Sequence, residues 1–254
     1  MASWAPSRLL SMDQVAESVL SWLRKGGVPL EYFTAQALRD AGFSAQQGAH
    51  YLDPSEKTTN REIDVLAWLE PKPITPVVLV FECKAADDKP WVVLTTEVPP
   101  EPVTPIAGAL AAVLADPAIS EPIIRRCLPM ASPHGFTIVE AHSDKNDRAH
   151  SAMEQVVSGA VGVQARFGKV DHCFAFPVLV TEAPLFRFEA PHVGQESVRP
   201  TRWERIRWNG AQAHAKPTFV DVVRRESLAA YLDGMRNQVH ALQEELSIFT
   251  RGRR

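Results

Sequence analysis

Three charged residues stand at the edges of two apolar segments, where a buried strand would meet solvent. Asp64 lies early in the segment 62–69, and Glu82 and Lys84 end the segment 77–84. Two carboxylates and a lysine are poor core residues, because burying a charge without a partner is costly. Carboxylate oxygens are the ligands that divalent cations such as Mg²⁺ prefer in proteins. The residue types therefore suggest metal-dependent hydrolysis of a phosphodiester bond.

The spacing of the two segments predicts that these side chains meet. Residues 70–76 lie between them and contain three prolines, which cannot donate hydrogen bonds to a strand ladder. A symmetric turn over this loop pairs Asp64 with Glu82 and Glu62 with Lys84, and even-numbered positions then share one face. Two opposed carboxylates repel each other, and a divalent cation would offset that repulsion.

The pattern of an acid, any residue and a lysine is weak when taken alone. It occurs three times in the chain, and only the copy at Glu82 and Lys84 ends an apolar strand that follows an acid-bearing one. A structural alternative is an ion pair between Lys84 and either Glu62 or Glu82 at the end of a sheet. The sequence leaves both interpretations open.

These residues resemble the PD-(D/E)xK nuclease superfamily, which has the restriction-endonuclease-like fold. Asp64 stands where that superfamily has its first metal-binding Asp, Glu82 where it has the Asp or Glu, and Lys84 where it has the Lys. The segment 61–64, Arg-Glu-Ile-Asp, is similar to the Glu-Ile-Asp version of Mrr-like and Holliday-junction-resolvase-like members, with isoleucine and not proline before the Asp. The resemblance covers residues 28–95 and a later helix.

The resemblance implies that Asp64, Glu82 and the backbone carbonyl of Cys83 hold Mg²⁺ or Mn²⁺. Lys84 would position or help to activate the attacking water, and Glu31, in the first helix of the core, would hold a metal-bound water. Glu31 has an equally good structural explanation, because an acid in the first turn of a helix is favoured by the helix dipole. The implied partner is nucleic acid, with DNA as the expected substrate.

The surrounding elements predict an α/β fold, with a restriction-endonuclease-like core in which helices flank a central mixed β-sheet, plus a helical insertion and a C-terminal extension. Periodicity, capping residues and turn residues together delimit the elements. Helices are expected at 12–25, 29–41, 147–166 and 228–246, and strands at 43–51, 62–69, 77–84, 172–181, 185–189 and 219–223. The strands at 172–181 and 185–189 are expected to form a hairpin.

The expected domains are an N-terminal helix (1–27), a nuclease-like core (28–190) with an insertion at about 96–144, and a C-terminal extension (191–254) with strands and a long amphipathic helix. The insertion begins with a proline-rich stretch and would hold one or two short helices, over 106–115 and 119–128. The segment 202–208 contains three Arg and two Trp residues. That segment would either form an outer strand or hold phosphates and stack on bases.

Composition limits the class of protein. The chain has 254 residues, of which 45% are hydrophobic and 22% charged, so it can bury one large core. A formal net charge of −3 argues against a strong nonspecific nucleic-acid binder but leaves room for a local basic surface. The three cysteines are widely spaced, as expected for reduced thiols in a cytoplasmic protein. No apolar run reaches the roughly 18 residues of a membrane helix, and no leader is expected.

The sequence supports three interpretations of function. The first is a metal-dependent endonuclease. The second is a nuclease-like fold that binds or senses nucleic acid without turnover, and the third is a partner-dependent subunit of a defence or repair complex. The last helix would either pack on the core or form a homodimer interface.

Overall fold

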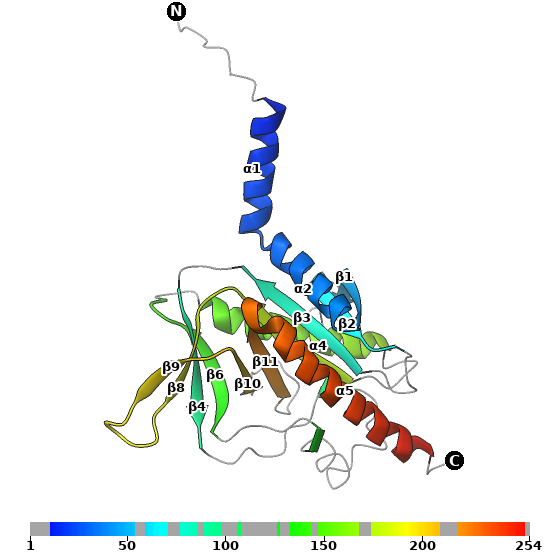
Figure 1. Ribbon diagram of the computed structural model, residues 1–254, viewed down its shortest axis with the longest axis vertical. Helices are drawn as coiled ribbons and strands as arrows, with labels where there is room; N and C mark the ends of the chain where they lie inside the picture. Colours follow the sequence, from blue (N-terminus) through cyan, green and yellow to red (C-terminus); the bar gives the residue numbers. More distant parts are fainter. Residues whose placement is uncertain are drawn as a thin grey trace, which may run out of the picture.

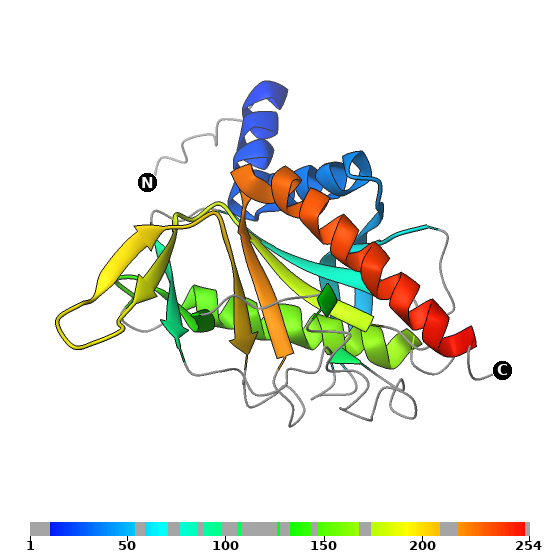
Figure 2. The same ribbon diagram turned by 60° about the horizontal axis from the view of Figure 1, so that its bottom comes forward.

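The computed structural model describes residues 11–53, 59–70, 77–85, 89–97, 106–107, 126–127, 133–143, 147–167, 174–208 and 218–251. These residues form an α/β fold in which a large mixed β-sheet has helices on both faces (Figures 1 and 2). The main helices are α1 (Met12–Lys25), α2 (Val28–Asp40), α4 (Arg148–Phe167) and α5 (Leu228–Arg251), with a short 3-10 helix, η2 (Arg225–Ser227), before α5. The expected mixed sheet flanked by helices is confirmed.

The strands follow one another along the chain as β1 (Ser44–Leu52), β2 (Asn60–Trp68), β3 (Val77–Lys84), β4 (Trp91–Thr96), β5 (Ile106–Ala107), β6 (His134–Glu140), β7 (Phe174–Thr181), β8 (Leu185–Glu189), β9 (Ser197–Pro200), β10 (Trp203–Trp208) and β11 (Thr218–Arg224). In space their order is β1-β2-β3-β7-β11-β10-β6-β4-β8-β9, with β5 beside β7. β1, β2 and β3 are antiparallel, whereas β3, β7 and β11 run parallel.

The two faces of β3 pack against different helices, because successive side chains of a strand point to opposite sides. Leu79 and Phe81 belong to a cluster with α2 and α5, whereas Val78 and Val80 belong to a cluster with α4. Figure 2 shows α5 and α4 on opposite sides of the sheet. The apolar stripe of α5 is buried at Leu228, Tyr231, Leu232, Met235, Val239 and Leu242. α5 therefore packs on the core, which was one of the two expected roles of the last helix.

Glycine brings α4 close to β1. A Cβ atom at Gly162 would lie 2.1 Å from Cδ2 of Tyr51, so only glycine fits the present packing. Gly159, one turn earlier, faces Val80 and Ile63, and a Cβ atom there would lie 3.4 and 3.7 Å from their side chains. These two glycines therefore set how closely α4 packs on this face of the sheet.

The N-terminal helix begins at the expected capping box. The Ser11 N–H donates to Oε1 of Gln14 at 2.9 Å, and the Gln14 N–H donates to Oγ of Ser11 at 3.3 Å. At the other end, Gly27 has φ of +85°, a left-handed conformation that favours glycine, and it turns the chain sharply into α2. α1 projects from the sheet (Figure 1), and its Trp22 side chain is 71% exposed. No described helix is long and apolar enough to cross a membrane.

Two expectations about strand pairing were wrong. β7 and β8 do not form a hairpin, because β7 pairs with β3 and β11 while β8 pairs with β4 and β9. β10 is not an outer strand, because it lies between β11 and β6. A local pattern identifies a strand but does not show which strand it pairs with. The pairing of strands that are far apart in the chain was therefore not predicted from the sequence.

The expected helical insertion at about 96–144 contributes two strands, β5 and β6, and a short helical segment where the structure describes it. Of the helix expected over 106–115, only β5 is described, and it pairs with β7. Arg126 and Cys127 are helical, and the rest of 119–128 lies outside the described residues. β6 lies between β10 and β4 in the sheet. The segment 191–254, which we expected to be an extension, places β10 and β11 inside the sheet that holds β3.

Candidate active site

The candidate site forms where the pairing of β2 with β3 stops. The last paired residues are Val65 and Phe81, in the register that a symmetric loop predicted. Extending this register by one residue aligns Asp64 with Glu82. Beyond that point β2 remains paired with β1, and β3 remains paired with β7. The side chains of the next residues therefore meet in the unpaired gap between β2 and β3. We call this gap, beside Asp64 and Cys83, the seam.

Asp64 fills this seam. Its Oδ2 accepts the N–H of Cys83 at 2.6 Å, in place of a backbone carbonyl of the ladder. Because N–H and C=O of one residue in a strand point to the same side, the Cys83 carbonyl also faces β2. Burial, followed by the charges of Glu82 and Glu31, raises the pKa of Asp64 to about 7, against the opposing effects of the Cys83 hydrogen bond and Lys84.

The route by which Asp64 reaches the seam differs from our expectation. Side chains do not alternate regularly along β2, because Ile63 packs with the α4 cluster while Val65, two residues later, packs with the α2 and α5 cluster. The expectation that even-numbered positions share one face is therefore wrong at Asp64. On β1, Gly48 lies between the partners of these two residues and has φ of +63°. This irregularity in β1 lies opposite the point where the alternation of side chains in β2 is interrupted. The Asp64 side chain consequently lies between the two faces of the sheet.

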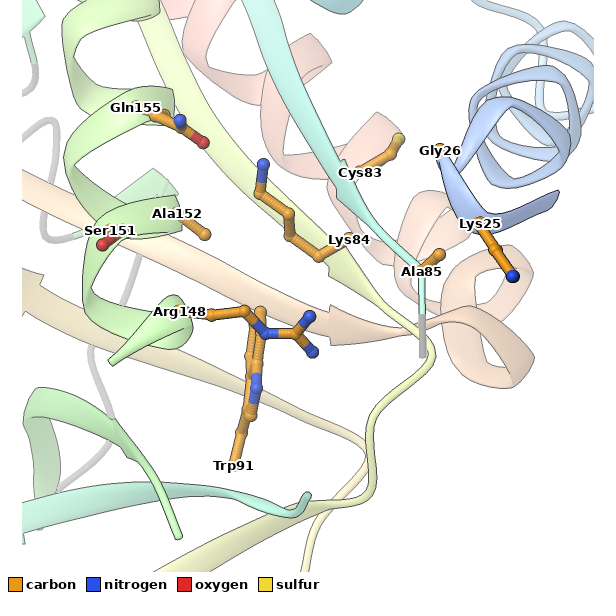
Figure 3. A pocket seen from close by; sticks show the side chains of 10 residues that line it. All are labelled: Lys25, Gly26, Cys83, Lys84, Ala85, Trp91, Arg148, Ser151, Ala152 and Gln155. Carbon is orange, nitrogen blue, oxygen red and sulfur yellow. The ribbon is translucent and has the colours of Figure 1, made fainter. Parts of the chain in front are cut away.

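Glu82 and Lys84 share one face of β3, as expected, and form an ion pair. Lys84 Nζ lies 2.6 Å from Glu82 Oε1, and the two side chains are 32% and 13% exposed. Figure 3 shows Lys84 extending from β3 toward Gln155 of α4. This is one of the ion pairs that the structural alternative foresaw, so the contact agrees with both interpretations of the motif.

α2 brings Glu31 to the same place from the other face of the sheet. Burial and the negative charges of Glu62 and Glu82 raise the pKa of Glu31, whereas Lys84 lowers it. The structure therefore brings Glu31, Asp64, Glu82 and Lys84 together. It adds Glu62, which the sequence considered only as a partner of Lys84. The available signal was its position two residues before Asp64.

Cys83 contributes its backbone and not its thiol. The Sγ atom points toward α2 and lies 3.5 Å from Thr34 Oγ1. Burial is the main cause that raises the pKa of this thiol, so it stays protonated at neutral pH. Cys83 and Cys127 are both free thiols, and Cys173 lies outside the described residues.

The donor chemistry of the seam fits a hard cation such as Mg²⁺, because all candidate ligands are oxygen atoms. Oδ1 of Asp64 and Oε2 of Glu82 have no hydrogen-bond partner within the described ranges. However, no group of three or more His, Cys, Asp or Glu side chains in the described part of the chain is arranged to hold a metal ion. A metal here would have two side-chain ligands, Asp64 and Glu82, and the Cys83 carbonyl.

The Arg and Trp residues of β10 do not form a phosphate-binding surface as a set. Arg205 is 6% exposed and forms two hydrogen bonds of 2.7 Å with the carboxylate of Asp221. Trp208 is buried as well, whereas Trp203 is half exposed and packs edge-on against Tyr231. Packing of the strand into the sheet therefore accounts for Arg205 and Trp208.

No family model, curated protein or solved structure matches this chain.

Proposed function

We propose that this protein is a metal-dependent endonuclease that hydrolyses phosphodiester bonds, with DNA as the expected substrate, at a PD-(D/E)xK-type site. One observation supports the proposal most strongly. Asp64 accepts the Cys83 N–H at 2.6 Å where the β2–β3 pairing ends, directly beside the ion pair of Glu82 and Lys84. Buried acids with a strongly raised pKa beside a specific charged partner are more common at functional sites than elsewhere.

The proposal includes a restriction-endonuclease-like core, and the order of the elements supports it. α2 carries Glu31 and precedes the antiparallel strands β1, β2 and β3. α4 follows β3 in the chain and packs on the sheet, as the resemblance implies for the helix after the strand with Glu82 and Lys84. In this core the acids come from three elements that pack on one another.

Each residue has a distinct proposed role. Asp64, Glu82 and the Cys83 carbonyl would hold Mg²⁺ or Mn²⁺, and Glu31 would hold a water at the edge of that site. Such an ion, when bound, lowers the pKa of a water and stabilises charge on the phosphate. Lys84 keeps a fixed position through Glu82 Oε1, 2.6 Å away, and its ammonium group orients the attacking water and offsets the developing negative charge.

The test is cleavage of supercoiled, linear and single-stranded DNA and of RNA by the full chain, in Mg²⁺ and in Mn²⁺. Asp64→Asn keeps an acceptor for the Cys83 N–H but removes the charge, and it should lower the rate by roughly 100-fold or more. Glu17→Gln is the matched control, because Glu17 lies on the exposed helix α1. Equal rates in wild type and Asp64→Asn would contradict the proposed site.

The ion pair of Lys84 with Glu82 also favours a second candidate, a nuclease-like module that binds nucleic acid without cutting it. Thermal unfolding with Mg²⁺ separates the two, because a ligand stabilises only the state that binds it. A nuclease gains stability in Mg²⁺, and Asp64→Asn does not. Nucleic-acid binding with neither cleavage nor stabilisation by metal would favour the module, and stabilisation without cleavage would favour a partner-dependent subunit.

A further inference from the structure

A pocket of about 340 Å³ lies beside the proposed catalytic lysine. Its wall includes the end of β3 with Lys84, the first turns of α4 with Arg148, and the junction of α1 and α2 with Lys25. Figure 3 shows Lys84 and Arg148 extending into this space from β3 and α4. Three cationic side chains from three different elements therefore line one hollow.

The described residues that line this pocket include no acid. Lys84 and Arg148 each have a carboxylate partner outside its lining: Glu82 for Lys84, and Glu140, 3.7 Å from Arg148 Nε, for Arg148. Lys25 has no ion-pair partner among the described residues. The pocket thus has an excess of positive charge, although the net charge of the chain is −3.

The chemistry of the charged side chains in the lining indicates the kind of ligand. Lysine and arginine side chains only donate hydrogen bonds and carry positive charge. The ligand should therefore be an acceptor with negative charge, such as a phosphate.

We propose that this pocket binds a phosphate group of the nucleic-acid strand, next to the bond that is cut. This inference rests on the proposed function, since Lys84 lines both the pocket and the proposed catalytic site. The volume exceeds that of one phosphate and lies at the lower end of the range for small-ligand pockets, which suits a phosphate with part of its nucleotide. Arg148 and Lys25 then fix the strand.

The first experiment measures the binding of inorganic phosphate to the full chain without divalent metal, by calorimetry and thermal unfolding. Wild type should bind saturably, and Arg148→Gln and Lys25→Gln should each raise the dissociation constant about tenfold or more. Arg199→Gln, a 61% exposed arginine on β9, is the control of equal charge change and should bind as wild type does.

The absence of saturable binding to wild type would overturn the inference, as would an equal effect of Arg199→Gln and Arg148→Gln. Phosphate binding with neither cleavage nor stabilisation by Mg²⁺ would remove the nuclease proposal and leave the phosphate site. Cleavage without phosphate binding would remove the phosphate site and leave the nuclease proposal.

A second arm identifies the source of the phosphate. Oligonucleotides with a 5′-phosphate, a 3′-phosphate or hydroxyl groups at both ends are compared by affinity for wild type and Arg148→Gln. If wild type prefers one phosphorylated end and Arg148→Gln abolishes this preference, the pocket binds a terminal phosphate. Equal affinities that all fall in Arg148→Gln assign an internal phosphate. Affinities that Arg148→Gln leaves unchanged would contradict the proposal.

Discussion

Asp64 is destabilising in its ionised form when no cation is bound. Burial and the charges of Glu82 and Glu31 raise its pKa from 3.8 to about 7. A carboxyl whose pKa is higher in the folded protein than in the unfolded chain binds protons more tightly in the folded state. The free energy of unfolding therefore falls as pH rises between 3.8 and about 7, and the loss is complete above that range.

Asp64→Asn should remove this loss and stabilise the metal-free protein at pH 8. One pKa unit corresponds to about 1.4 kcal/mol, so a rise from 3.8 to about 7 sets an upper limit of about 4 kcal/mol on the gain. Thermal unfolding from pH 4 to pH 8 measures it, and the advantage of the variant should shrink as pH falls. A gain in the free energy of unfolding that does not vary with pH would show that ionised Asp64 does not destabilise the folded protein. A variant less stable than wild type at pH 8 would show the same.

At the scale of elements, the site depends on the close approach of α4 to β1. A Cβ atom at Gly162 would lie 2.1 Å from Cδ2 of Tyr51. Burial, followed by the charge of Asp53, raises the pKa of Tyr51 to about 12, and the charge of Glu82 adds a smaller contribution. The packing of Tyr51 therefore links α4 to β1, the strand paired with β2 and Asp64.

Gly162→Ala should lower stability by about 1–3 kcal/mol, because overpacking exceeds the gain of alanine in a helix. Gly234→Ala on α5 is the matched control. A Cβ atom there would meet nothing within 4 Å, so the change should stabilise the protein by up to about 1 kcal/mol. Urea unfolding of both variants measures the difference, and equal stabilisation by both would contradict the packing of Tyr51 on α4.

The sequence predicted those elements whose signals are local. The capping box of α1 and the β2–β3 register follow from residues close together in the chain, and both were correct. The place of β10 inside the sheet and the change of face at Asp64 were not predicted. The first depends on pairing between distant segments, and the second accompanies the left-handed conformation of Gly48 on a neighbouring strand. The residues of the candidate site were therefore easier to find than the geometry that joins them.

At the scale of the whole molecule, a buried network ties the C-terminal segment to the sheet. Arg205 of β10 pairs with Asp221 of β11, and the Tyr231 hydroxyl of α5 donates to the same carboxylate at 2.8 Å. β11 lies directly beside β7, which is the neighbour of β3. The segment that we expected to be an extension therefore supports the strand with Glu82 and Lys84.

Arg205→Met should destabilise the protein by about 3–5 kcal/mol, because it leaves the Asp221 charge buried without its partner. Tyr231→Phe removes a single hydrogen bond and should cost about 1 kcal/mol. Denaturant unfolding should show one cooperative transition for each variant, with fluorescence and circular dichroism in agreement. Two separate transitions in Arg205→Met would show instead that the C-terminal segment folds as its own unit.

The most direct test of the proposed nuclease site is the cleavage rate of Lys84→Met compared with wild type. The substitution keeps an unbranched side chain that is one atom shorter and removes the charge, and loss of a partly exposed ion pair should change stability by at most about 1 kcal/mol. We predict an intact fold, stabilisation by Mg²⁺ as in wild type, and a cleavage rate lower by roughly 100-fold or more. Cleavage at the wild-type rate by a folded Lys84→Met variant would contradict the proposed role of this site.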